Sequence, residues 1–152
     1  MKLSENFSLH EFTKSQTATR HNIKNVPNDK QIFNLRNLCV NVLQPVRDYF
    51  LKPMIISSGF RSVELNIKIG STIKSQHIQG MAADVEVLDV GNLELSNYIH
   101  NNLKYDQLIL EFHNPEDLHS GWVHVSYNAE NNRHEYKEAY KNDEGKTRYR
   151  LR

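Results

Sequence analysis

The sequence predicts one α+β domain, and two hydrophobic patterns carry that prediction. Residues 28–50 place apolar side chains three and four positions apart, as an amphipathic helix does. Residues 82–87, 107–112 and 122–127 alternate apolar and polar side chains, which indicates half-buried strands. A chain of 152 residues with only six glycines and four prolines has the size and composition of one folded domain.

Local signals place the other elements. Ser8 followed by Glu11 is a capping box, which predicts a short first helix. Pro45 is expected to kink the long helix or to split off its last turn. The remaining expectations are a buried strand over 53–58, a helix over 62–69 ending at Gly70, a loop over 71–81, and a helix over 92–103 capped by Asn92.

The composition restricts the class of protein. Nineteen basic and 18 acidic residues give a net charge of +1, which argues against a strongly basic nucleic-acid binder. One cysteine excludes an intramolecular disulfide framework and a cysteine-rich zinc site, so any metal must use nitrogen and oxygen ligands. No stretch approaches the length of a membrane span, and Met1–Asn6 contains no apolar signal region. We therefore expect no membrane insertion and a cytoplasmic location in the producing cell.

Each of the three alternating strands is expected to carry an ionisable residue in mid-strand. Asp84, Glu111 and His124 each lie on the polar face of their strand. Such residues are costly to bury unless they are paired or bind a metal. One shared site would explain all three together, if the three polar faces point the same way.

The loop before the first of these strands supplies a further ligand candidate. His77 precedes Asp84 by seven residues, and Gly80 allows the chain to turn between them. His77, Asp84 and His124 would form a three-ligand catalytic zinc site with a fourth position open to water. Glu111 would then be the carboxylate that a general base requires.

The run Ser75-x-His77-x-x-Gly80-x-Ala82-x-Asp84 resembles the SxHxxGxAxD motif of D-alanyl-D-alanine carboxypeptidase-type zinc peptidases. Similar segments of that family match Ser58–Ser62, Asp106–Phe112 and Gly121–Tyr127, and the resemblance covers roughly residues 7–127. It implies a hedgehog-like fold, with helices on one side of a small antiparallel sheet and the metal site on the other. The N-terminal segment is similar to the compact branch that is common in bacteriophages.

The resemblance also implies roles for individual residues. His77, Asp84 and His124 would bind one zinc ion, and Glu111 would be the catalytic base. Arg61 would contact a substrate carboxylate or the developing oxyanion, although a surface ion pair is the alternative. Ser75 would bind near the metal or the substrate, or would only shape the loop.

One position departs from the family pattern. Several branches carry the catalytic acid three residues before the last histidine ligand, where this chain has Gly121. His113 and His119 are therefore second candidates for stabilising the transition state. The other four histidines, read as surface or packing residues, are His10, His21, His100 and His134.

Residues 128–152 are mostly polar and are expected to be a basic C-terminal tail of the single domain, residues 1–152. Basic residues alternate at positions 146, 148, 150 and 152. They form either a solvated tail or charged edge strand, or a surface that attracts anionic wall polymers or nucleic acid.

The implied function is hydrolysis of stem or crosslink peptides in bacterial peptidoglycan by a monomer, without specific nucleic-acid binding. The activity would be that of a phage endolysin-type endopeptidase, released through a holin for lysis, or of a D-Ala-D-Ala carboxypeptidase. A virion-associated enzyme is also compatible with the sequence. The alternative from another class is a non-catalytic, metal-stabilised hedgehog-like domain that binds the wall or builds the virion.

Overall fold

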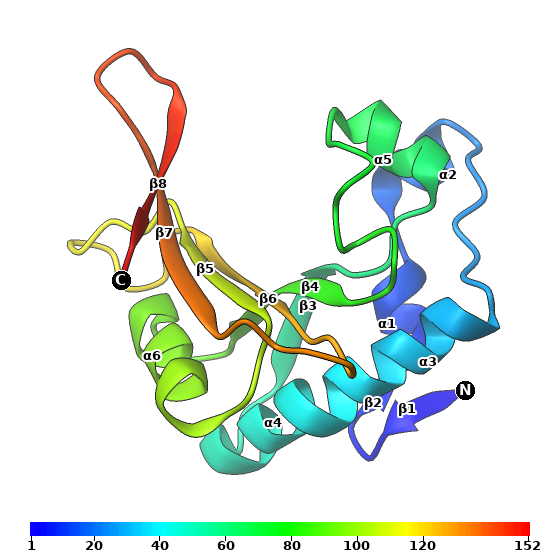
Figure 1. Cartoon of the computed structure of the whole chain (residues 1–152), viewed down its shortest axis with the longest axis horizontal. Coiled ribbons are helices and arrows are strands. Elements are labelled where there is room, and N and C mark those ends of the chain that lie inside the picture. The colour runs from blue at the N-terminus through cyan, green and yellow to red at the C-terminus, as the bar shows by residue number, and fades with distance from the viewer.

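The computed structural model describes residues 1–152, and a six-stranded sheet forms its centre (Figure 1). The strand order is β3-β4-β6-β5-β7-β8, and every neighbouring pair is antiparallel except β5 and β7, which are parallel. The strands are β3 (Met54–Ser58), β4 (Ala82–Val87), β5 (Gln107–Glu111), β6 (Trp122–Ser126), β7 (Glu135–Lys141) and β8 (Thr147–Leu151). A two-stranded ribbon, β1 (Lys2–Ser4) and β2 (Phe7–Ser8), precedes them.

The long helical segment at residues 29–50 and α6 cover one face of the sheet, and the predicted α+β class is confirmed. The buried side of the long helical segment and of α6 packs against the apolar face of β4, β5 and β6. The helices are α1 (Leu9–Thr13), α2 (Gln16–Arg20), α3 (Asp29–Leu38), η1 (Cys39–Leu43), α4 (Gln44–Phe50), α5 (Val63–Ile69) and α6 (Asn92–Asn102).

The long helix is interrupted where Pro45 predicts an interruption. Residues Cys39–Leu43 form a π-helical turn, closed by the bond from the Gln44 N–H to the Cys39 carbonyl. Because Pro45 has no N–H, it cannot continue the ordinary bonding pattern, and the wider turn directly before it accommodates that loss. Cys39 is buried in the core, as its apolar neighbours indicate.

The alternation of β4 sets the two faces of the sheet. Ala83, Val85 and Val87 belong to the core, whereas Asp84 and Glu86 point to the opposite face. The same division continues through β5 and β6. The polar side chains that the sequence places on three strands therefore do share one face.

Three expectations need correction. The expected polar tail instead contains β7 and β8, because Tyr136 and Ala139 are buried and β7 pairs with β5. The strand at 53–58 is an edge strand with alternating burial, since it pairs only with β4. The helix cap is Gly91 instead of Asn92, whose side chain donates to the carbonyl oxygens of Ser120 and Gly121.

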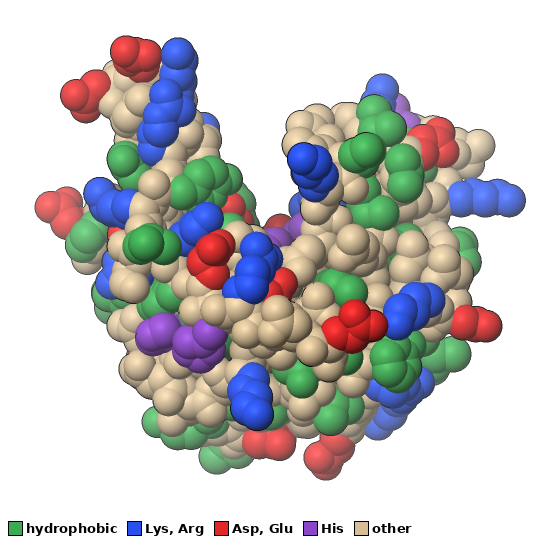
Figure 2. All heavy atoms as spheres, viewed as in Figure 1, with side chains coloured by type: hydrophobic (Ala, Val, Ile, Leu, Met, Phe, Trp, Pro, Cys, Tyr) green, Lys and Arg blue, Asp and Glu red, His purple; other side chains and the backbone are tan.

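Two arms rise above the open face of the sheet. The β7–β8 hairpin forms one arm, and α2 and α5 lie side by side in the other (Figure 1). The space-filling view shows a deep hollow between these arms, with histidine side chains at its base (Figure 2). No helix combines the length and hydropathy required to cross a membrane.

Candidate metal centre

Strand register brings the predicted ligands and base to one area of the sheet. Asp84 on β4 lies directly opposite His124 on β6. On the other side of β6, His124 lies opposite Ile109, and Glu111 lies opposite Trp122. Glu111 is therefore the diagonal neighbour of His124 on the same face.

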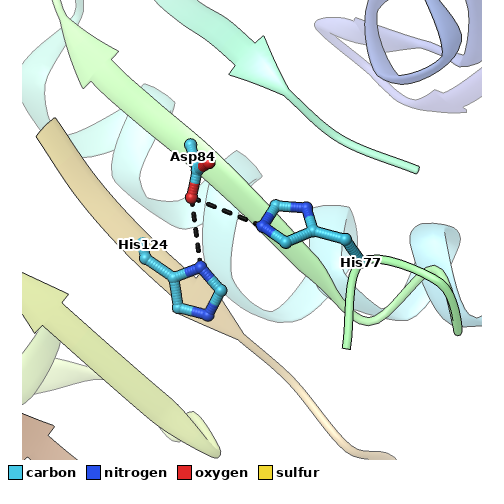
Figure 3. A group of neighbouring side chains, drawn as sticks. All are labelled: His77, Asp84 and His124. Atoms are coloured by element: carbon cyan, nitrogen blue, oxygen red, sulfur yellow. Dashed lines mark hydrogen bonds and ion pairs between the residues drawn. The ribbon is translucent and has the colours of Figure 1, made fainter. Parts of the chain in front are cut away.

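The third ligand candidate reaches the same point from the loop before β4. The Nδ1 atom of His77 donates to the Gly59 carbonyl oxygen at 2.7 Å, which directs its Nε2 atom to the site. His77 Nε2 lies 3.5 Å from Asp84 Oδ1, and His124 Nδ1 lies 3.1 Å from the same oxygen (Figure 3). The donor atoms of the three side chains lie within 4.8 Å of one another.

The donor set suits a divalent metal ion. The side chains of His77, Asp84 and His124 are 5%, 12% and 13% exposed, so the group is shielded but open on one side. Burial would raise the pKa of Asp84, but the bonds to His124 and His77 lower it well below its usual value. Burial lowers the pKa of His77. An ionised carboxylate and a neutral imidazole are the forms that bind zinc.

Glu111 faces the same cavity, which has a volume of about 640 Å³. Burial raises the pKa of Glu111, and the nearby Asp84 carboxylate raises it further, against the lowering influence of His124 and Arg61. A carboxylate with a raised pKa is a better proton acceptor, which is the property that a general base needs. Its role stays a prediction, but its position agrees with that role.

Arg61 lies at the edge of this cavity and is not a surface ion pair. Its guanidinium group is 3.6 Å from Asp84 Oδ2, and its side chain is only 14% exposed. It donates to Ser58 Oγ at 3.1 Å and to Asn66 Oδ1 at 3.2 Å. Burial lowers its pKa, while Asp84 and Glu111 favour the charged form. The guanidinium is thus fixed beside the metal site, where an anion could be bound.

Ser75 contacts the ligand loop itself. Its Oγ atom accepts a hydrogen bond from the His77 N–H at 3.2 Å. It also lines the cavity. This hydrogen bond supports the interpretation that Ser75 shapes the loop. The interpretation that Ser75 binds substrate stays a prediction.

Asn25 is a positioning residue that the sequence analysis missed. Its side chain accepts from the Ser62 N–H at 2.7 Å and donates to the Phe60 carbonyl at 3.0 Å, on either side of Arg61. It also donates to the Thr13 carbonyl at 2.9 Å. An asparagine in a loop gives no local signal of such long-range contacts.

Asp106 is a second missed residue. It is 3% exposed, and its Oδ2 atom accepts from Gln76 Nε2 at 2.7 Å, next to His77 in the chain. Arg133 donates to both of its carboxylate oxygens, at 2.9 and 3.0 Å. This buried carboxylate therefore ties the ligand loop to the segment before β7. Its sequence signals are its place just before an apolar strand and at the start of the family-like segment Asp106–Phe112, and neither indicates its contacts with Gln76 and Arg133.

The C-terminal hairpin completes one wall of the cavity. A row of paired residues runs across β6, β5, β7 and β8: Trp122, Glu111, Ala139 and Tyr149. The last of them, Tyr149, lines the cavity. The basic residues that alternate with Tyr149 lie on the other face. There, Arg150 and Arg152 each pair with Glu138, at 3.2 and 3.0 Å. These contacts correspond to the charged edge strand among the two interpretations of this segment.

The second candidates do not line the metal cavity. His119 is exposed in the loop between β5 and β6. Both ring nitrogens of His113 are buried without a hydrogen-bond partner. Neither residue lies among those that surround the predicted ligands, so Glu111 remains the acid–base candidate.

A mixed sheet with helices on one face and a His–Asp–His cluster on the other makes this an α+β protein with a candidate metal centre. The sequence model of the family described as Peptidase M15 matches residues 5–126, which is most of the chain. The chain belongs to this family of zinc-dependent D-Ala-D-Ala carboxypeptidase-type peptidases. A search of curated proteins finds no match to it. Strands β7 and β8 lie outside the matched range.

Proposed function

We propose that this protein is a zinc-dependent peptidase that hydrolyses peptide bonds in bacterial peptidoglycan. The observation that carries the proposal is the position of Glu111, diagonal to His124 and facing the cavity that contains His77 and Asp84. Family membership supports peptidase activity. The resemblance of the sequence motifs to wall-cutting peptidases supports the substrate.

His77, Asp84 and His124 would hold the zinc ion. When bound, the ion supplies Lewis acidity, which lowers the pKa of water and polarises a carbonyl group. Glu111 accepts the proton of the attacking water and returns it to the leaving amine. Arg61, fixed by Ser58 and Asn66, faces the negative charge that develops on the carbonyl oxygen.

The finer proposal is a phage endolysin-type endopeptidase or a D-Ala-D-Ala carboxypeptidase that acts as a monomer. It would be made in the cytoplasm of the host cell and reach the wall through a holin, or would travel with the virion. These points rest on the similarity of the N-terminal segment to the compact, often phage-encoded branch.

Incubation of the zinc-loaded protein with purified peptidoglycan tests the proposal, with new amino groups as the readout. We expect their release with the loaded protein and none with a chelator present. Mass analysis of the products then identifies the bond that is cut. Full zinc binding without release of amino groups would instead support the non-catalytic, metal-stabilised domain.

A further inference from the structure

A second and larger cavity begins at Arg61 and extends away from the metal site. This groove has a volume of about 990 Å³ and contains Arg61 in its wall, which it shares with the metal cavity. Seven consecutive residues, Ile55–Arg61, line one side of it. Residues of the segment Lys14–Arg20 other than Ala18, together with Leu65 and Ile69 of α5, line the other sides.

The charged side chains that line the groove are all basic. Lys14, Arg20 and Arg61 line it together with His10, and no aspartate or glutamate does. Arg61 is already engaged with Asp84. Lys14 and Arg20 are exposed, and neither lies within ion-pairing distance of a carboxylate. Two exposed cations without a carboxylate partner, in a groove that no acidic side chain lines, favour a negatively charged ligand.

The shape of the groove favours an extended peptide. Its strand, β3, is the edge of the sheet and pairs only with β4. An edge strand presents backbone groups that an extended peptide can pair with, and Ile55–Ser58 would accommodate about four residues. Ile55 and Ile69 provide apolar contacts, and Ser15, Thr17 and Thr19 provide hydroxyl groups.

We propose that this groove binds an extended, negatively charged segment of the substrate peptide on one side of the bond that is cut. The segment leaves the metal cavity at Arg61 and follows β3, with its carboxylates next to Lys14 and Arg20. The inference rests on the proposed function and deepens it: the substrate is an acidic peptide that is longer than the metal cavity alone would select.

The test is a binding measurement with the full chain carrying Glu111→Gln and loaded with zinc, so that no turnover interferes. The probes are soluble disaccharide-peptides from muramidase-digested peptidoglycan, and the same peptides with methyl-esterified carboxylates. Lys14→Glu with Arg20→Glu is compared with a matched double reversal, Lys24→Glu with Lys104→Glu. These two control lysines are exposed and line neither cavity. Thermal unfolding verifies that both variants fold.

We call Lys14→Glu with Arg20→Glu the groove variant. It should bind the acidic peptides with a Kd about tenfold higher or more, and this Kd should depend less on salt concentration than that of the wild type. The control variant and the esterified peptides should show no such change. An unchanged Kd in the groove variant overturns the proposal. The proposal is also overturned if the groove variant loses binding of phosphate-rich wall polymers but binds the peptides as the wild type does. If the wild type binds the peptides in a charge-dependent manner but does not hydrolyse them, the proposed function is contradicted, whereas the proposal that the groove binds acidic peptides is supported.

Discussion

Gly121 lies against the backbone of Glu111 and leaves no room for a side chain. Its φ angle is +67°, and a Cβ atom at this position would overlap the Glu111 carbonyl oxygen. Several branches of the family carry the catalytic acid at this position, three residues before the last histidine ligand. In this chain the loop after β5 folds back too closely for that arrangement. Glu111 therefore remains the acid–base group that we propose.

Gly121→Ala should therefore cost more stability than an ordinary glycine replacement. Gly145 is the matched control, because its φ angle is +77° but nothing lies within 4 Å of an added Cβ atom. Gly145→Ala should lose about 1–2 kcal/mol of unfolding free energy, and Gly121→Ala clearly more. Denaturant unfolding measures both. Equal losses would show that the close approach to Glu111 has no energetic consequence.

His77→Ala should remove metal binding and activity together. In the wild type, zinc at 100 times its Kd should stabilise the fold by about 2.7 kcal/mol. The variant should show no stabilisation, because it lacks one of three ligand candidates. His21→Ala is the control, since His21 is exposed and does not line the cavity. Normal zinc content in His77→Ala would count against the proposed ligand set.

Asp106→Asn should weaken the fold in a pH-dependent manner. Burial would raise the pKa of Asp106, but the bonds from Arg133 and Gln76 lower it below its ordinary value of 3.8. A carboxyl group with a lowered pKa stabilises the fold above its ordinary pKa and loses that contribution as the pH falls toward the folded value. The wild type should thus exceed Asp106→Asn by about 1 kcal/mol near pH 6, discounted for the exposure of Arg133.

Thermal unfolding between pH 6 and pH 2 measures this difference, which should shrink below about pH 4. Asp143→Asn, in the exposed turn between β7 and β8, is the control and should follow the wild type. Because Asp106 also holds Gln76 beside His77, Asp106→Asn should bind zinc more weakly. A constant stability difference across the whole pH range would rule out this role of the Asp106 carboxylate.

Tyr149→Ala should raise KM and leave kcat little changed. Tyr149 lines the metal cavity from the C-terminal hairpin. It lies on β8, two strands away from Glu111 on β5, so it should contact the substrate but not the reacting bond. Tyr140 on the neighbouring strand is the control, because Arg150 stacks over its ring on the other face. Kinetics with peptidoglycan fragments distinguish the two. A loss of kcat alone in Tyr149→Ala would show that the residue acts on the chemical step.

The sequence predicts the face of the sheet that carries the site, because strand alternation depends only on local pattern. Asp84, Glu111 and His124 share that face, and the capping box at Ser8 forms as expected. Strand β7 escaped prediction because its stability depends on pairing with β5, which is far away in the chain, whereas an edge strand was one of the two interpretations of the segment that forms β8. Asn25 and Asp106 escaped for the same reason, since their partners are distant loops.

Glu111→Gln tests the central claim most directly, with zinc content and peptide-bond hydrolysis measured on the same preparation. Because Glu111 is not one of the three ligand candidates, the variant should retain one zinc ion per chain. Hydrolysis should fall at least about 100-fold, as expected for loss of a general base. Glu116→Gln, in the exposed loop after β5, should behave as wild type. Full hydrolysis by Glu111→Gln, or loss of its zinc, would contradict the account.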